Sequence, residues 1–241
     1  MQTRRIAMWS GPRNLSTAMM YSFAARGDCH VEDEPFYGAY LAQTGMDHPM
    51  RDEVIASQPS DPDSVAARCT GPIPQAQSLF YQKHMTVHML PDWNRGFMRD
   101  LTNVFLIRHP ARVVASYAKK REAPTLMDIG FVQQAQLFDE VADFLGHAPL
   151  VLDSADVRAD PRAALTRLCA ALGIPFTERM LSWKAGPKPY DGVWASRWYG
   201  EVHKSTGFGA PEADLPTLPA EFQTLSDAAM LHFEHLLRHR I

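Results

Sequence analysis

The chain has 241 residues, of which 46% are hydrophobic and 21% are charged, which is typical of a folded globular protein and excludes a disordered one. Its formal net charge of −3 at pH 7 excludes a general basic surface that would attract nucleic acid or a membrane. Three cysteines without metal-ligand spacing favour buried thiols in a reducing compartment, and no apolar run reaches transmembrane length. We therefore expect one cytoplasmic domain over residues 1–241, without a nucleic-acid or membrane partner, that holds any anionic ligand by a local cluster of basic side chains.

A short apolar run at residues 6–9 predicts the first strand, and residues 16–26 predict the first helix. The loop between them can direct its backbone N–H groups, and those of the first helical turn, at one anion. Arg13 adds a fixed positive charge, and Ser16 and Thr17 can cap the helix or donate to a phosphate or sulfate oxygen. An ordinary strand-to-helix turn with an exposed arginine is the alternative for this stretch taken alone. The candidate anion-binding residues are Gly11, Pro12, Arg13, Asn14, Leu15, Ser16 and Thr17.

Residues 28–32 predict a second short strand, and Glu34 lies in the loop that follows its end. In open α/β sheets this edge is where ligands bind. Residues 78–82 predict the next strand, which ends at Lys83. Residues 40–75, between these strands, alternate turn-rich and helical stretches, and we expect them to cover one side of the ligand site.

Residues 101–107 form the clearest core strand of the sequence, and Arg108 follows it directly. Ser116 lies eight residues further on, in a helix whose first turn suits Pro110. Helical side chains lean toward the N-terminus, so a strand-end arginine and a helix serine can meet over one anion. A solvated arginine and a solvated serine are the alternative for either residue taken alone.

The remainder of the chain continues to alternate strands and helices. We expect a strand at 149–152, helices at 126–145, 162–172 and 219–240, and a long loop region rich in Gly, Pro, aromatic and basic residues at 183–210. This alternation predicts a three-layer α/β fold with a mostly parallel central sheet and helices on both faces.

Residues 11–17 and 108–116 together resemble the two nucleotide-binding motifs of the sulfotransferases that use 3′-phosphoadenosine 5′-phosphosulfate (PAPS). Residues 11–17 are similar to the family's 5′-phosphosulfate loop, Gly-x-Pro-Arg/Lys-Ser-Gly-Thr-Thr/Ser. Residues 108–116 are similar to its 3′-phosphate motif, an arginine after a strand followed eight residues later by a serine. Residues 150–176 resemble the stretch before the family's C-terminal lid, and Lys184 and Gly186 are distantly similar to the lid's Arg-Lys-Gly segment, which closes over the 3′-phosphate. The resemblance covers most of the chain and implies a P-loop NTPase-like topology with PAPS as co-substrate and no metal.

Two positions of the first motif depart from the family pattern. Leu15 stands where the family usually has glycine, and Asn14 where it usually has serine. A side chain at position 15 limits how closely the backbone can approach a sulfonate, so the loop could hold its anion in another geometry or hold a different anion. Arg13, in place of the lysine of many cytosolic members, keeps the charge but presents a planar fork of donors.

Sulfuryl transfer needs a general base for the acceptor's proton, and two residues are candidates. Glu34 lies in a place similar to that of the base in several carbohydrate-type and bacterial sulfotransferases. His84 resembles the histidine of the Lys-x-His of cytosolic members, although here it is adjacent to Lys83. We favour Glu34 as the base, with Lys83 or His84 near the bridging oxygen. A surface Glu34, a core His84, or replacement of Glu34 by Glu32 or Asp33 are the alternatives.

The resemblance thus implies an enzyme, a sulfotransferase that moves a sulfuryl group from PAPS to a hydroxyl or amine of a small-molecule acceptor by in-line displacement. Residues 40–75 would then form an acceptor-side insertion and residues 183–210 a C-terminal lid. A non-catalytic nucleotide- or anion-binding protein on the same fold is the alternative from another class. A P-loop kinase is the third reading, and it lacks the Walker Gly-Lys-Ser/Thr ending after Gly11.

Overall fold

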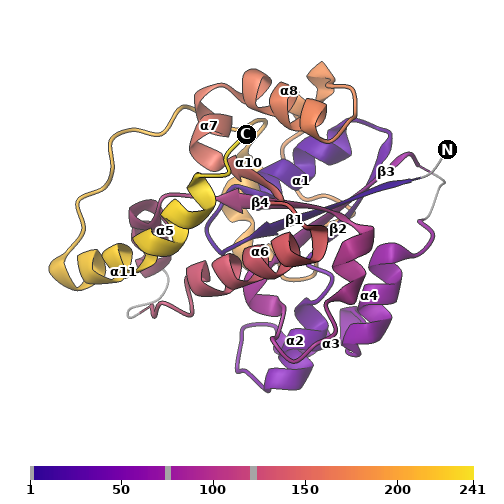
Figure 1. Cartoon of the computed structure of the whole chain (residues 1–241), viewed down its shortest axis with the longest axis horizontal. Helices are drawn as coiled ribbons and strands as arrows, with labels where there is room; N and C mark the ends of the chain where they lie inside the picture. The colour runs from indigo at the N-terminus through magenta and orange to yellow at the C-terminus, as the bar shows by residue number, and fades with distance from the viewer. Residues whose placement is uncertain (1–2, 74–76, 120–123) are drawn as a thin grey trace.

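A central sheet of five parallel strands organises the computed structural model, which describes residues 3–73, 77–119 and 124–241 (Figure 1). The strands lie in the order β2-β3-β1-β4-β5, so the first strand of the chain is central. Every residue of that strand from Ile6 to Ser10 is buried, because the strand has neighbours on both sides and helices over both faces. The strands are β1 (Arg4–Ser10), β2 (Cys29–Asp33), β3 (Leu79–Met85), β4 (Thr102–Ile107) and β5 (Leu150–Asp153).

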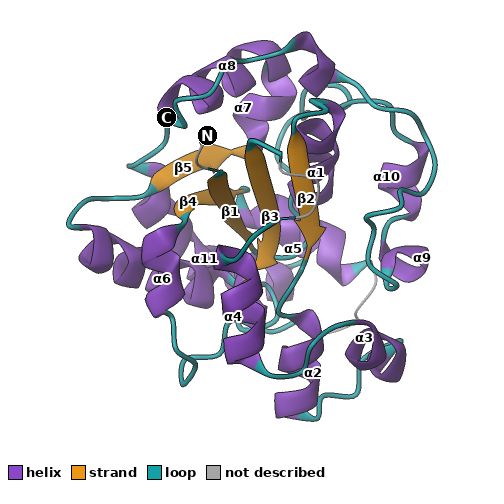
Figure 2. Cartoon of the chain, turned by 90° about the vertical axis from the view of Figure 1, so that its right-hand side faces the viewer, coloured by secondary structure: helices purple, strands orange, loops and turns teal. Residues whose placement is uncertain are grey.

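Two hydrophobic cores lie on opposite faces of the sheet, as the helices on its two sides indicate in Figure 2. Ala7 and Trp9 of β1 belong to the core covered by α4, α5, α6 and α11, whereas Ile6 and Met8 belong to the core covered by α1, α7 and α8. The predicted three-layer α/β fold with its P-loop-like topology is therefore confirmed. The helices are α1 (Ser16–Ala25), α2 (Tyr37–Thr44), α3 (Arg51–Ser57), α4 (Pro62–Thr70), α5 (Pro110–Ala118), α6 (Phe131–Leu145), α7 (Ser154–Ala159), α8 (Pro161–Ala171), α9 (Ala195–Trp198), α10 (Gly200–Lys204) and α11 (Ala220–Leu237), with 3-10 turns η2 (Thr86–His88), η3 (Gly96–Asp100) and η4 (Glu178–Leu181).

The starts of α5 and α8 follow from local sequence. Each helix has a proline in its first turn, where the missing N–H is not needed. The preceding residue caps the helix: His109 accepts a backbone N–H through Nδ1 at 3.2 Å, and Asp160 accepts one through Oδ1 at 2.9 Å. The predicted helix start at Pro110 is thereby confirmed.

Other boundaries differ from expectation. The helix predicted from residue 126 begins only at Phe131, because Gly130 precedes it with a φ of +75° and ends the helical geometry there. The predicted segment 40–75 contains the end of α2 and all of α3 and α4, and its last two residues lie outside the described part of the chain. The predicted loop region 183–210 contains the two short helices α9 and α10.

Cys29, Cys69 and Cys169 are all free and buried, as the sequence led us to expect. Across the residues that the structure describes, none of the helices combines the length and the apolar character needed to cross a membrane.

Candidate functional site

The loop after β1 meets the end of β4, which brings together three of the predicted anion-binding residues. Nε of Arg13 donates a hydrogen bond to Oγ of Ser116 at 3.1 Å, and Nη1 of Arg108 donates to the carbonyl oxygen of Arg13 at 2.8 Å. These residues are far apart in sequence, but β1 and β4 are adjacent parallel strands whose carboxyl ends lie side by side. Burial, and then the charge of Arg108, lower the pKa of Arg13. Two cations held this close create a place where an anion is stabilised.

Leu15, the main departure from the family pattern, is the N-cap residue of α1 and makes no capping bond with its side chain. Its backbone N–H is held by Oδ1 of Asn14 at 2.8 Å, and Nδ2 of Asn14 donates to the carbonyl oxygen of Leu106 at 2.8 Å. The Leu15 side chain packs against the core beneath α1. Asn14 thus fixes the loop to β4, while Ser16 and Thr17 start the helix rather than cap it and line the adjacent cavity.

Gly11 packs closely against the turn before α6. A Cβ atom at position 11 would lie 3.1 Å from the carbonyl oxygen of Ile129. At Gly130, in the same turn, a Cβ atom would lie 3.2 Å from Cδ of Pro12. The turn therefore supports residues 11–17, here called the anion loop, from the side of α6.

A cavity of about 930 Å³ contains both the anion loop and the favoured base. Its walls include residues 12–18, which follow β1, Arg108 and Ser116, which follow β4, and Glu34 and Lys83 at the ends of β2 and β3. Further wall residues come from α2, the loop before α3, the 3-10 turn η2 and the segment around α9 and α10; they include Tyr37, His48, His88, Trp194, Trp198 and Tyr199. The structure thus places basic side chains and a carboxylate along the walls of one cavity.

Lys83 is the centre of a buried charged cluster at the ends of β2 and β3. Its Nζ donates to Oδ1 of Asp33 at 2.8 Å, to the hydroxyl oxygen of Tyr199 at 2.7 Å and to Oε1 of Glu34. The Tyr199 hydroxyl in turn donates to Oδ2 of Asp33 at 2.7 Å. Glu34 has a φ of +42°, a left-handed conformation that is rare for a residue with a side chain and that Arg13 shares at +56°. This backbone geometry directs Glu34 out of the strand direction of β2.

The protonation of the cluster follows from burial and charge. Burial opposes the charge on Lys83, but Asp33 and Glu34 outweigh it and raise the pKa of Lys83. Burial raises the pKa of Asp33, against the opposing attraction of Lys83. Nδ1 of His88 lies 3.7 Å from Oε2 of Glu34, and burial holds the pKa of His88 well below its usual value. Glu34 therefore faces one lysine cation and one neutral imidazole.

His84, the other candidate base, lies away from the cavity. Its ring stacks on Trp9 with centroids 4.2 Å apart, and its Nε2 lies 3.1 Å from Oε1 of Gln82. Because side chains alternate along β3, the lysine and the histidine leave the strand on opposite sides, and Lys83 is the one that lines the cavity. The structure supports the alternative of a core histidine and does not bring His84 to a reacting atom or a bridging oxygen.

Replacing His84 with Phe is expected to reduce the loss of stability in acid. Burial, and then His88 and Lys83, lower the pKa of His84 to about 3, whereas the unfolded chain binds the proton near 6.5. The contribution of neutral His84 to the free energy of unfolding is fully present above pH 6.5 and is lost as the pH falls toward about 3, at about 1.4 kcal/mol per pH unit. Urea unfolding of both proteins at pH 7, 5.5 and 4 measures how steeply the free energy of unfolding falls with pH. Equal dependence on pH in the two proteins would contradict a buried neutral imidazole.

The predicted lid residues Lys184 and Gly186 do not line the cavity. Lys184 is exposed, and its carbonyl oxygen accepts a hydrogen bond from Nζ of Lys188 at 2.6 Å. The backbone N–H of Gly186 donates to the carbonyl oxygen of His203 at 2.6 Å. The nearby segment instead reaches the cavity through Tyr199, Ser205 and Gly207, among others.

Sequence reasoning did not find the role of Tyr199 or the ion pairs of Glu212. Tyr199 reaches the end of β2 from a distant part of the chain, and the sequence near it offers several other aromatic residues. Glu212 pairs with Arg108 and Arg112 from a loop that has no secondary structure. The alternation of side chains along β2 is a signal for Asp33, because Cys29, Val31 and Asp33 share one face of the strand and are all buried.

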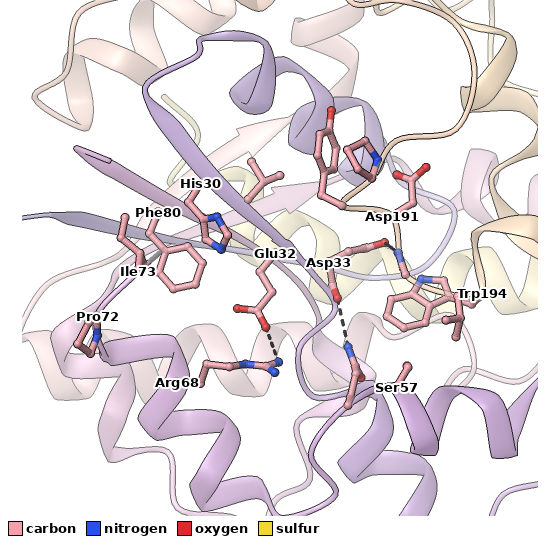
Figure 3. Close-up of a pocket in the computed structure, with 16 residues that line it drawn as sticks. His30, Glu32, Asp33, Ser57, Arg68, Pro72, Ile73, Phe80, Asp191 and Trp194 are labelled. Atoms are coloured by element: carbon pink, nitrogen blue, oxygen red, sulfur yellow. Dashed lines mark hydrogen bonds and ion pairs between the residues drawn. The ribbon is translucent and has the colours of Figure 1, made fainter. Parts of the chain in front are cut away.

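A second cavity, of about 700 Å³, lies on the outer side of β2 (Figure 3). Figure 3 shows Glu32 directed at Arg68 of α4, with which it forms an ion pair, and Asp33 beside the segment that carries Trp194. The backbone N–H of Gly192 donates to Oδ2 of Asp33 at 3.1 Å. Glu32 therefore faces a different space from Glu34, which weakens it as a replacement base.

The residues described by the structure contain no group of three or more His, Cys, Asp or Glu side chains that could hold a metal ion.

Residues 4–240 match the sulfotransferase domain family, and the chain belongs to that family. Two relatives from Arabidopsis thaliana, named branched-chain-amino-acid aminotransferase-like proteins 1 and 2, are each 36% identical to it over 97% and 89% of this chain. The chain spans only 42% and 38% of the lengths of these relatives.

Solved sulfotransferase structures share the fold. The sulfotransferase domain from the curacin biosynthetic pathway is 16% identical with a TM-score of 0.55, and the match covers 95% of this chain and 98% of that one. A sulfotransferase from Alicyclobacillus acidocaldarius is 11% identical with a TM-score of 0.56, and the match covers 100% of this chain and 98% of that one. The predicted family resemblance is confirmed.

Proposed function

We propose that the chain transfers a sulfuryl group from PAPS to a hydroxyl or amine of a small-molecule acceptor. The observation that carries this proposal is the shared cavity, whose walls include Arg13, Arg108 and Ser116 as well as the Glu34–Lys83 pair. Sulfuryl transfer needs both parts, because anionic oxygens must be neutralised at the leaving group while a base removes the acceptor's proton.

In this proposal the loop of residues 11–17 and Arg13 bind the 5′-phosphosulfate, and Arg108 and Ser116 bind the 3′-phosphate. Bound PAPS supplies the sulfuryl group, and its 5′-phosphate oxygen takes the electron pair of the broken S–O bond. The acceptor oxygen or nitrogen forms the new bond to sulfur, and Glu34 takes its proton. Positioning of the two reactants in line accounts for much of the rate.

Lys83 orients Glu34 in this scheme. Its three donor positions are directed at Asp33, Glu34 and Tyr199, so contact with a bridging oxygen requires the exchange of one of these bonds. The bond to Oε1 of Glu34 leaves Oε2 as the oxygen that takes the proton. Charge from Lys83 then stabilises the carboxylate until the acceptor is bound.

The second candidate function is a non-catalytic protein that binds an adenosine bisphosphate or another anion on this fold. The observation that favours it is the ion pair between Arg108 and Glu212. Arg108, which is predicted to bind phosphate, already has a carboxylate partner within the chain.

Thermal shift and calorimetry with adenosine 3′,5′-bisphosphate and with ATP–Mg²⁺ test the ligand class. We expect stabilisation by the bisphosphate, and stabilisation by ATP–Mg²⁺ alone would contradict a sulfotransferase site. Incubation with PAPS labelled in its sulfuryl group and a broad panel of alcohols, phenols and amines then tests transfer. Bisphosphate binding without labelled product from any acceptor would favour the non-catalytic function.

Replacing Arg108 with Ala is expected to weaken binding of adenosine 3′,5′-bisphosphate by about 1.5–3 kcal/mol, because a charge-assisted contact to phosphate is lost. Calorimetry measures the change. Arg162→Ala is the matched control, since Arg162 is an exposed arginine paired with Glu178 on the surface, and its affinity should equal that of the unmodified protein. Unchanged affinity in Arg108→Ala would remove Arg108 from the phosphate site.

A further inference from the structure

The segment of residues 209–218, here called the strap, leads to α11 as the long orange-to-yellow connection in Figure 1. It has no regular secondary structure, and most of its residues are exposed. Unlike most of the strap, Glu212 is largely buried, with only 7% of its side chain accessible to solvent. A carboxylate on an exposed segment is buried to this degree only when strong partners hold it.

The partners of Glu212 are two arginines of the predicted 3′-phosphate motif. Nε of Arg108 donates to Oε1 of Glu212 at 3.1 Å, and Nη2 of Arg108 contacts the same oxygen. Nε of Arg112 lies 2.9 Å from Oε2. The strap is also held through its backbone, since Arg112 donates to the carbonyl oxygen of Ala213, and Nε of Arg158 donates to that of Ala210 at 3.0 Å.

This arrangement is an anion site occupied by the chain's own carboxylate. Two guanidinium groups face a single negative charge, so one positive charge remains uncompensated. A phosphate monoester carries about −1.5 to −2 charges and three terminal oxygens, so it matches the pair of guanidinium groups better than a carboxylate does.

The position of the site fits one end of a nucleotide. Arg108 also donates to the carbonyl oxygen of Arg13, so an anion on Arg108 lies beside the anion loop. Arg108 lines the 930 Å³ cavity, whereas Arg112 and Glu212 do not. Displacement of Glu212 would therefore extend the cavity from Arg108 to Arg112.

We propose, on the basis of the proposed function, that Glu212 occupies the site of the ligand's 3′-phosphate and that the ligand binds Arg108 and Arg112 by displacing Glu212 together with the strap. Arg112 then becomes a phosphate-binding residue beside Arg108. A nucleotide with a 5′-phosphate alone cannot compete for the arginines, so the strap also makes the site select for a 3′-phosphate.

Calorimetry of Glu212→Gln with adenosine 3′,5′-bisphosphate and adenosine 5′-phosphate tests the competition. We expect the bisphosphate to bind Glu212→Gln at least about tenfold more tightly than the unmodified protein, and the monophosphate to bind both equally. Glu221→Gln removes the same charge from an exposed position in the first turn of α11 and should change neither affinity. In the Glu212→Gln background, Arg112→Gln should lower bisphosphate affinity at least about tenfold.

Cleavage by a glutamate-specific protease tests displacement in the unmodified protein and does not depend on the folding of any variant. Cleavage after Glu212, identified by fragment mass, should accelerate with the bisphosphate and not with the monophosphate, while cleavage after Glu221 serves as the internal reference. Equal bisphosphate affinity in both proteins, with unchanged cleavage after Glu212, would overturn the displacement while leaving the proposed function in place. Absence of bisphosphate binding to either protein would overturn both.

Discussion

Replacing Glu34 with Gln is expected to lower sulfuryl transfer from PAPS at least about 100-fold, because an amide cannot take the acceptor's proton. Affinity for adenosine 3′,5′-bisphosphate should stay unchanged, since Glu34 follows the edge strand β2, whereas Arg13 follows β1 and Arg108 and Ser116 follow β4. Transfer of the labelled sulfuryl group measures the rate, and calorimetry measures the affinity.

Glu32→Gln is the matched control for this variant. Glu32 is a neighbouring carboxylate on β2, but it pairs with Arg68 and faces the second cavity (Figure 3). Its removal should leave transfer near the unmodified rate. Full activity in Glu34→Gln would exclude Glu34 as the general base, and another group would have to take the acceptor's proton.

Replacing Lys83 with Met is expected to reduce the free energy of unfolding by about 3–5 kcal/mol at pH 7, because the loss of one partner leaves buried charges uncompensated. The Lys83 and Asp33 side chains are each only 2% exposed, and Glu34 is 10% exposed. Urea unfolding measures the change. Lys204→Met is the control, because the Lys204–Glu201 pair lies on the surface and should contribute at most about 1 kcal/mol.

The pH dependence of Lys83→Met has a definite sign. Burial already raises the pKa of Asp33, and removal of the lysine takes away the attraction that opposes this rise. A carboxyl group with a raised pKa in the folded state stabilises the fold below the unfolded pKa and loses that contribution as the pH rises through the folded value. The stability gap to the unmodified protein should therefore narrow from pH 8 to pH 5. A gap that widens toward pH 5, or one no larger than that of Lys204→Met, would contradict a buried ion cluster.

The fold could be predicted from the sequence because its signals are local. The apolar runs of β1 and β4 are buried on both faces, and the start of α5 is marked in the sequence by Pro110. Because β1 and β4 are adjacent parallel strands, the segments that follow them meet, and Arg13 contacts Ser116.

The surroundings of the base could be predicted only in part. Glu34 and Lys83 follow from strand ends, but the choice between Lys83 and His84 depends on which face of β3 meets Trp9. That choice is made by packing between distant segments, which periodicity alone does not specify. Tyr199 reaches the site from the junction of the short helices α9 and α10, and Glu212 from an irregular segment. At neither place does a period in the sequence indicate which side chain turns inward.

Leu15 shows how a departure from a motif can be absorbed by the fold. The sequence raised the possibility that its side chain holds an anion away from the backbone. In the structure this side chain packs against the core under α1 and also lines the cavity, while Oδ1 of Asn14 accepts the backbone N–H of Leu15. Asn14 therefore holds the loop backbone to β4 without a glycine at position 15.

Arg13 and Glu34 both have positive φ angles, and the proposed chemistry uses both side chains. Glycine would adopt either conformation without strain, whereas a side chain there destabilises the fold by about 1–2 kcal/mol. At both positions contacts of the side chain offset this strain, since Arg13 donates to Ser116 and Glu34 accepts from the buried Lys83. A glycine at position 34 would relieve the strain but leave the buried Lys83 with one carboxylate partner fewer, a loss of about 3–5 kcal/mol, so selection for thermostability alone would keep the proposed base.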